Sequence, residues 1–159
     1  MSVCRNINTK DCFVMTGKMA LPNQYFAGRV GSKFIISLRD AKKILGVKCP
    51  KCGLVYVPPR EYCEKDLEKL DQDQNWVELG NEGVITNFTI VNYNDKHLPR
   101  RAPYVLALIK VEGADTPFAH IVEGIESEHM KIGMRVKAVF AEQTTHTILD
   151  IDHFEPIRA

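Results

Sequence analysis

The sequence predicts a mainly β protein in which an N-terminal helix leads into a small metal-binding ribbon and then into a five-stranded barrel. Three observations indicate this fold class. Apolar residues recur at helical spacing before residue 46, cysteines form a knuckle pattern between residues 49 and 63, and short runs rich in β-branched residues fill the chain beyond residue 76. A chain of 159 residues with 45% hydrophobic residues can form one ordinary domain or two small ones.

The chain begins with an arm and a helix. Residues 1–24 are polar and have no regular pattern, and an arm of this kind either meets a partner surface or stays disordered. Residues 25–46 are expected to be a helical segment. A helix is predicted over about residues 33–45, because apolar side chains recur there at helical spacing: Phe34, Leu38, Ala41 and Leu45. Gly46 is the expected left-handed residue after the end of this helix.

The cysteines predict a zinc ribbon over residues 47–70. Cys49 and Cys52 are separated by two residues, and Gly53 directly follows, which is the pattern of a metal-binding knuckle. Cys63 comes after a short strand-like run, and Asp66 stands where a ribbon usually has its fourth cysteine. Thiolates and carboxylates are both ligands of zinc, so we predict that one structural Zn²⁺ is bound by these side chains: Cys49, Cys52, Cys63 and Asp66.

Other interpretations of these residues stay open. The first two cysteines could be a redox pair, although such a pair usually opens a helix, or all the thiols could be inert and buried. Asp66 could be a solvated surface carboxylate, in which case Cys4, Cys12 or a histidine would supply the fourth ligand. A carboxylate is a harder ligand than a thiolate, so a site with Asp66 should retain its metal less strongly than a four-cysteine site.

Residues 76–157 carry the pattern of a small β-barrel. A first short strand is predicted at 76–79, and five further strand-like runs follow at about 83–91, 104–111, 118–122, 134–140 and 148–154. A short helix is expected over residues 126–131, between the third and fourth of these five runs. Five strands with one helix in that position is the order of an OB-fold. The connection over residues 92–102 is long, and long loops in small barrels are often functional.

The charge balance and the absence of export signals limit the possible functions. The chain has 21 basic and 20 acidic side chains, whereas proteins that grip nucleic-acid backbones normally have a marked basic excess. No apolar run approaches the roughly 18 residues of a membrane span, and the N-terminus lacks the apolar region of a signal peptide. We therefore expect a cytoplasmic protein. No nucleophile–base set stands out, and His120 is interpreted as a hydrogen-bonded barrel residue.

Several motifs together resemble a known family. Lys42-Lys43-Ile44-Leu45-Gly46 runs into Cys-Pro-x-Cys-Gly and then Pro58-Pro59-Arg60, and these are followed by Cys63, the run at 83–91 and Ile132-Gly133-Met134-Arg135-Val136. This combination resembles the acyl-CoA-associated proteins of bacteria and archaea, which have an N-terminal helix, a rubredoxin-like zinc ribbon and a C-terminal OB-fold. The resemblance covers about residues 24–157. Members usually have four cysteines in the ribbon, so Asp66 is a departure that affects metal affinity more than fold.

The resemblance also implies a function. Family members accompany thiolase-like enzymes as non-catalytic subunits that help to hold acyl-CoA or that bridge a thiolase to its next enzyme. For this chain it implies an accessory subunit that binds a thiolase-fold catalytic subunit, which supplies the reactive Cys and His. Together they would hold a CoA thioester while a carbon–carbon bond of a β-ketoacyl-CoA is cleaved or formed. The small zinc-finger subunits of thiolases that cleave 2-benzoylsuccinyl-CoA are one instance of the family.

Charge placement suggests which side chains would meet the phosphates of such a CoA thioester: Arg39, Lys42, Lys43, Arg100 and Arg101. The alternative for each is a solvated surface cation. The alternative function is binding of single-stranded nucleic acid, for which zinc ribbons and OB-folds are also combined, with three candidate stacking residues: Tyr93, Tyr104 and Phe118. An independent hydrolase of CoA esters is a third hypothesis.

Overall fold

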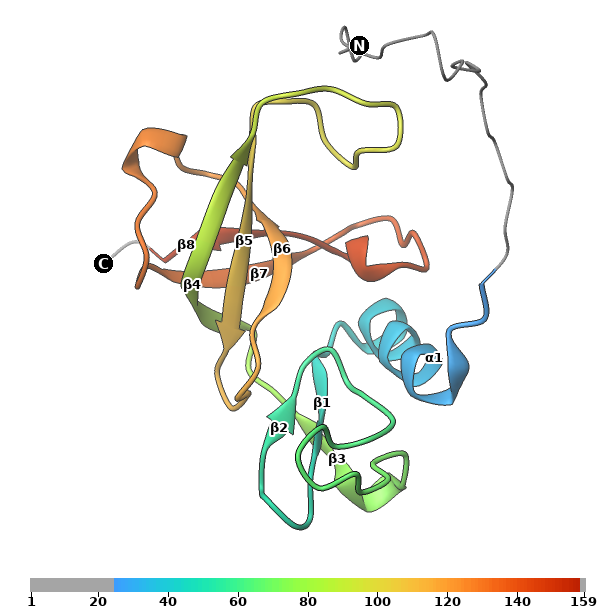
Figure 1. Ribbon diagram of the computed structural model, residues 1–159. Coiled ribbons are helices and arrows are strands. Elements are labelled where there is room, and N and C mark those ends of the chain that lie inside the picture. Colours follow the sequence, from blue (N-terminus) through green and yellow to red (C-terminus); the bar gives the residue numbers. More distant parts are fainter. Residues whose placement is uncertain (1–24, 158–159) are drawn as a thin grey trace, which may run out of the picture.

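The computed structural model describes residues 25–157, so the predicted arm, Cys4 and Cys12 lie outside the described residues. Figure 1 shows a barrel with a small three-stranded ribbon at one end and the helix α1 beside the ribbon. The predicted fold class is confirmed, because the chain has one N-terminal helix, a ribbon and a closed five-stranded barrel.

The helix starts and ends earlier than its sequence pattern indicated. α1 spans Gly28–Ile36 and continues into a π-helical turn over Ser37–Ala41. Lys42 ends the π-turn in the left-handed conformation, with φ of 52°, and its N–H donates to the carbonyl of Ser37. The expected helix is therefore present, but its predicted bounds of 33–45 and its predicted left-handed end at Gly46 are wrong. Gly46 lies in a strand, where a Cβ atom would come within 3.1 Å of the Leu79 side chain.

The ribbon consists of three short strands. β1 (Leu45–Lys48) lies in the middle and pairs antiparallel with both β2 (Val55–Tyr56) and β3 (Trp76–Glu78). β2 ends at Tyr56, and Val57 is followed by Pro58 and Pro59, which cannot donate a hydrogen bond to a ladder. The strand predicted at 76–79 is present, and tertiary pairing places it in the ribbon sheet rather than in the barrel.

The barrel contains the five strands that the sequence pattern predicts. They are β4 (Glu82–Val91), β5 (Tyr104–Val111), β6 (Phe118–Val122), β7 (Arg135–Phe140) and β8 (Ile151–Pro156), in the closed order β4-β5-β6-β8-β7. The expected helix between the third and fourth of them is a single 3₁₀ turn, Ser127–His129. Two further 3₁₀ turns precede β3 and β8: Asp73–Asn75 and Ile148–Asp150.

His120 links β6 to the 3₁₀ turn that precedes β8. β6 and β8 run parallel and pair through Val122 and Phe154. Nearby, the buried imidazole of His120 accepts a hydrogen bond on Nδ1 from the N–H of Ile121, at 2.9 Å. Its Nε2 lies 3.3 Å from the carbonyl oxygen of Ile148 and therefore donates to it. The interpretation of His120 as a hydrogen-bonded barrel residue is confirmed.

One apolar core joins the helix to the barrel. Phe34 of α1, Leu38 of the π-turn and Ile44 are almost completely buried and belong to the same cluster as the inward-facing barrel side chains. Val57, directly after β2, belongs to this cluster as well. The helix and the ribbon are therefore fixed on the barrel by shared burial of apolar area, at roughly 25 cal/mol per Å².

Candidate metal centre

The predicted metal ligands lie on two turns that have the same backbone hydrogen bonds. In the first turn, the N–H of Gly53 donates to the carbonyl of Cys49 at 2.9 Å, and the N–H of Cys49 donates to the carbonyl of Leu54 at 2.8 Å. In the second, Leu67 donates to Cys63 at 3.0 Å and Cys63 donates to the carbonyl of Glu68 at 2.9 Å.

The two turns also match in the flanking pairs and in backbone conformation. Lys48 pairs with Val55 across the first turn, and Tyr62 pairs with Lys69 across the second. The residue after the last candidate ligand has positive φ in both cases, 77° at Gly53 and 54° at Leu67. Asp66 therefore occupies, in the second turn, the position that Cys52 occupies in the first.

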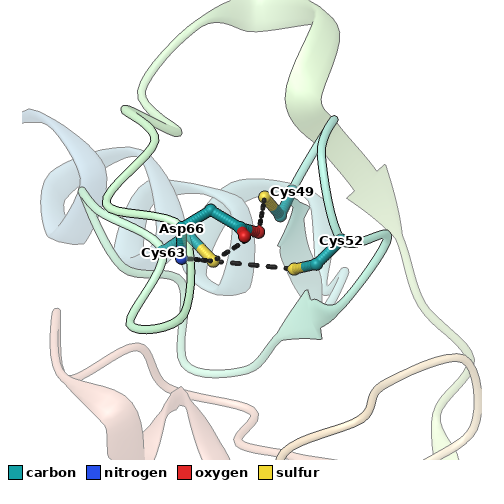
Figure 2. A group of neighbouring side chains, drawn as sticks. All are labelled: Cys49, Cys52, Cys63 and Asp66. Carbon is teal, nitrogen blue, oxygen red and sulfur yellow. Dashed lines mark hydrogen bonds between the residues drawn. The ribbon is translucent and has the colours of Figure 1, made fainter.

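The four predicted ligands come together in space. Figure 2 shows the side chains of Cys49, Cys52, Cys63 and Asp66 pointing toward one another, and their ligand atoms all lie within 4.8 Å of one another. Cys49 and Cys63 are buried, and the other two side chains are half-buried. None of the other described residues forms a comparable group of metal-binding side chains.

The distances within this cluster fit a tetrahedral zinc ion. Tetrahedral ligands at normal zinc bond lengths lie about 3.8 Å apart for two sulfurs and about 3.5 Å apart for a sulfur and an oxygen. The Sγ atoms of Cys52 and Cys63 are 3.6 Å apart. Asp66 Oδ2 is 3.5 Å from the Sγ of Cys49 and 3.6 Å from that of Cys63. Three sulfurs and one carboxylate oxygen are also a chemically suitable donor set for Zn²⁺.

Charge crowding in the cluster shifts the pKa values of its members in opposite directions. A hydrogen bond to Asp66 raises the pKa of the Cys52 thiol to about 12. The same contact with Cys52, together with those from Cys49 and Cys63, lowers the pKa of the Asp66 carboxyl. The carboxylate therefore holds its negative charge while a neighbouring thiol keeps its proton, and a bound cation would relieve this crowding of acceptor atoms.

One neighbour of the cluster was not predicted from the sequence. Tyr56 is completely buried, and its hydroxyl lies 3.2 Å from the Sγ of Cys63. The backbone N–H of Asp66 donates to the same sulfur at 3.4 Å. Burial alone would raise the pKa of the Cys63 thiol, but the hydrogen bonds from Tyr56, from the backbone N–H groups of Asp66 and Lys65, and from Cys49 together lower that pKa. The hydrogen bond with Cys63 in turn raises the pKa of Tyr56.

The cations predicted to bind CoA do not gather at this centre. Arg39 forms an ion pair with Asp40, with Nη2 2.7 Å from Oδ2, and Lys43 forms one with Glu78, at 2.7 Å. Lys42 has no ion-pair partner among the described residues. Arg39 lies in the π-turn with Nη1 3.4 Å from Nδ1 of His146, in the loop before β8, and Lys42 and Lys43 directly follow the π-turn.

Arg100 and Arg101 lie in the loop between β4 and β5. Figure 1 shows this loop at the end of the barrel that faces away from the ribbon. The half-buried guanidinium of Arg100 binds Glu123 at 2.8 Å and Asp152 at 2.5 Å, so it ties the loop to β8 and to the end of β6. Arg101 is exposed and forms no ion pair with the described residues. The structure therefore does not bring the two groups of cations together.

Family models match both modules of the chain. The rubredoxin-like zinc ribbon domain of ChsH2 matches residues 39–69, and the C-terminal OB-fold domain of ChsH2 matches residues 76–141. A DUF35 domain-containing scaffold protein of Methanocaldococcus jannaschii is 35% identical over 103 residues, which are 65% of this chain and 71% of that protein. The chain belongs to the DUF35 family.

Other DUF35 proteins are more distant in sequence. A DUF35 domain-containing scaffold protein of Methanothermobacter thermautotrophicus is 27% identical over 97 residues, which are 61% of this chain and 71% of that protein. A crystal structure of a DUF35 protein from Sulfolobus solfataricus superposes with a TM-score of 0.59 at 27% identity, covering 81% of this chain and 84% of that one.

The fold is also that of a chain in the Ltp2-ChsH2(DUF35) aldolase structure. The TM-score is 0.59 at 19% identity, over 79% of this chain and 92% of that one, so this likeness concerns the fold alone. As for membranes, the described residues contain no helix with the length and apolar character needed to cross one.

Proposed function

We propose that this DUF35 chain is a non-catalytic accessory subunit of a thiolase-type complex. It would bind a thiolase-fold catalytic subunit and help to hold an acyl-CoA while that subunit cleaves or forms a carbon–carbon bond of a β-ketoacyl-CoA. The observation that carries this proposal is the match to a DUF35 scaffold protein, which extends over 71% of that relative. The structure named Ltp2-ChsH2(DUF35) aldolase supports it, because there a DUF35 chain of the same fold is associated with an aldolase.

The ion pairs of the predicted cations indicate which of them could bind the phosphates of CoA. Arg39, Lys43 and Arg100 are already neutralised by carboxylates, so they offer less attraction to an anion than their charge alone indicates. Arg101 lines a hollow of about 710 Å³ inside the β4–β5 loop, together with Lys96 and a single carboxylate, Asp95. Arg100 and Arg101 also border the neighbouring groove of about 620 Å³, but three carboxylates line it and repel phosphate: Glu123, Glu126 and Glu128. Of the predicted cations, Lys42 and Arg101 form no ion pair with the described residues, and Arg101 borders the hollow in the loop, so we propose the phosphate contact at Lys96 and Arg101.

The surface of the barrel gives less support to nucleic-acid binding. OB-folds hold single strands on the face of their second and third strands, here β5 and β6, by stacking bases on aromatic side chains. The hollow on this face is lined by Leu106, Leu108 and Ala119, without a basic residue, and its aromatic residue, Phe88, packs against the core. Phe118, a candidate stacking residue, is 3% exposed and belongs to the core.

The experiment that tests the proposed function is purification of the tagged full-length chain from its native source, with native mass spectrometry of what remains bound. We expect a thiolase-fold protein in stoichiometric amount. The KM of the reconstituted complex for acyl-CoA should rise when Arg101 is replaced by alanine, and replacement of exposed Arg135, which is paired with Glu82 and Glu112, is the matched control. Recovery of nucleic acid instead of a catalytic subunit would overturn the proposal.

A further inference from the structure

Tyr56 connects the candidate metal centre to the strand β2. Its hydroxyl lies 3.2 Å from the Sγ of Cys63 and is the donor when that sulfur is a metal-bound thiolate without a proton, and its ring is fully buried in the small ribbon core. The guanidinium of Arg60 lies over the face of this ring, 5.4 Å from its centroid. A donor in this position fixes the orientation of a metal-bound thiolate and reduces its basicity. The tyrosine therefore acts on a metal ligand without being a ligand itself.

The backbone on both sides of Tyr56 is hydrogen-bonded to the turn that joins β5 to β6. The N–H of Val55 donates to Asp115 Oδ2 at 2.8 Å, and the N–H of Asp115 donates back to the carbonyl of Val55 at 2.9 Å. The N–H of Val57 donates to Thr116 Oγ1 at 2.9 Å, and that hydroxyl donates to the carbonyl of Val57 at 3.0 Å. Four hydrogen bonds thus hold the free edge of β2 on the barrel.

The side chains of Tyr56 and Val57 point to opposite faces of the strand. Successive side chains of a β-strand point to opposite faces. Tyr56 points into the ribbon core toward Cys63, whereas Val57 is 1% exposed and packs in the core shared with the barrel. A shift of the metal-binding turn therefore moves Tyr56 and, through one peptide unit, the contacts of Val57 with the barrel.

We propose that Tyr56 is a positioning residue of the metal centre, and that the segment Val55–Val57 couples metal binding to the position of the β5–β6 turn. Because coupling between two sites is reciprocal, a change at the turn must alter metal binding as much as metal binding alters the turn. The proposal concerns the chain's own metal centre and holds whichever partner the chain has.

The first test is the rate at which the zinc-loaded full-length protein gives up its metal to an excess of a chromogenic chelator. Tyr56→Phe keeps the ring and removes only the hydroxyl, so we expect zinc release to accelerate about 10-fold to 100-fold. The matched control is Tyr62→Phe, since Tyr62 is next to Cys63 in sequence but is 52% exposed. This control should release zinc at the rate of the unchanged protein. Equal release rates for the two variants would overturn the role of Tyr56.

The second test changes the β5–β6 turn of the barrel and measures zinc release from the ribbon. Thr116→Ala removes two of the four hydrogen bonds to β2 without touching the metal ligands, and we expect it to accelerate zinc release about fivefold or more. Thr89→Ala, on the exposed outer surface of β4, is the matched control and should leave the rate unchanged. Zinc release from Thr116→Ala at the control rate would show that the turn and the metal are independent.

Hydrogen exchange in the zinc-loaded proteins gives a readout that does not depend on metal release. In Tyr56→Phe, the amides of Val55, Val57 and Asp115 should exchange faster than in the unchanged protein, whereas amides paired between β7 and β8 should not change. If Tyr56→Phe does not bind zinc, Thr116→Ala supplies the same comparison. Unchanged exchange at these three amides in a variant that does release zinc faster would overturn the coupling and leave only a local role for Tyr56.

Discussion

The ribbon and the barrel of this protein are stabilised in different ways. Of the described residues, 17 form the buried cluster that fills the barrel and reaches the helix, and all of their side chains are apolar. The buried cluster of the ribbon has five members, of which two are candidate metal ligands: Val47, Cys49, Tyr56, Cys63 and Leu70. A core of this size does not offset the conformational entropy of the chain around it, so the ribbon depends on its metal and on its contacts with the barrel.

The two regions also differ in how they use polar groups. In the barrel, buried His120 is satisfied by backbone partners and stays neutral. In the ribbon, sulfur and carboxylate atoms lie close together and repel one another unless they share a cation or protons. A bound metal would therefore be part of the core of the ribbon, whereas the barrel is filled by apolar side chains without it. Substitutions in the ribbon should therefore change zinc binding first, whereas substitutions in the barrel should change the free energy of unfolding.

The largest effect is expected from removing a buried metal ligand. Cys63→Ser should abolish stoichiometric zinc binding and open the ribbon, because the metal contributes on the order of 10 kcal/mol in isolated zinc fingers. Zinc content by elemental analysis and hydrogen exchange of the ribbon amides are the measurements. Glu64→Gln, a change at the exposed next residue, should keep its zinc. Full zinc content in Cys63→Ser would contradict the ligand assignment.

A cavity in the barrel should lower stability without removing the metal. Phe154 is 0% exposed, and its ring meets those of Phe118 and His120 at centroid distances of 5.9 and 5.6 Å. Phe154→Ala should reduce the free energy of unfolding by about 3–5 kcal/mol, measured by denaturant titration, with zinc content unchanged below the transition. Ile157→Ala, at a position 37% exposed, is the control and should have little effect. Loss of zinc from natively folded Phe154→Ala would mean that the two regions are a single unit.

The fourth ligand gives a sharper test of the ribbon alone. Asp66→Ala should weaken zinc binding by about tenfold or more, since even changes outside the ligand shell cost that much. Asp66→Cys should strengthen it, because thiolate is the softer ligand. Competition with a chelator measures the affinity, and the charge-transfer bands of the Co²⁺ form report the number of sulfur ligands. If the unchanged protein, Asp66→Ala and Asp66→Cys bound zinc with the same affinity, Asp66 would not be a metal ligand.

The smallest effect is a pH dependence that belongs to the barrel. Burial lowers the pKa of His120, so its folded-state pKa lies below the value of about 6.5 expected in the unfolded chain. Below about pH 6.5 the unfolded state takes up a proton first, and the free energy of unfolding should fall as the pH falls. Unfolding titrations at pH 7.5 and 5.5 should show a smaller loss for His120→Gln than for the unchanged protein. His97→Gln, at an exposed loop position, is the control and should lose as much stability between these two pH values as the unchanged protein.

Much of the fold was predictable because its signals are local. Runs rich in β-branched residues located the barrel strands, and the spacing of Cys49, Cys52 and Cys63 located the ribbon. The position of Asp66 in the second turn was enough to propose it as a ligand. These patterns survive in the structure because strand alternation and the knuckle turn are set by residues close in sequence.

Other features were decided by contacts between distant segments. Periodicity extended the helix to residue 45, but the chain leaves it at Lys42, because β1 must pair with both β2 and β3. Arg100 looked like a free cation until the fold placed Glu123 and Asp152 beside it. A tyrosine between two valines gave no sign of a metal neighbour, since the turn that carries Cys63 reaches it only in the folded state.

The sequence by itself therefore determined the order of the modules, the strands of the barrel and the four side chains of the candidate metal centre. The tertiary structure decided which cations are neutralised, where the helix ends, and that Tyr56 and the β5–β6 turn are connected to the metal-binding turns. The physical reason is the same in each case. Hydrogen-bond partners and ion pairs far apart in sequence depend on how the modules pack, and no local pattern of residues encodes that packing.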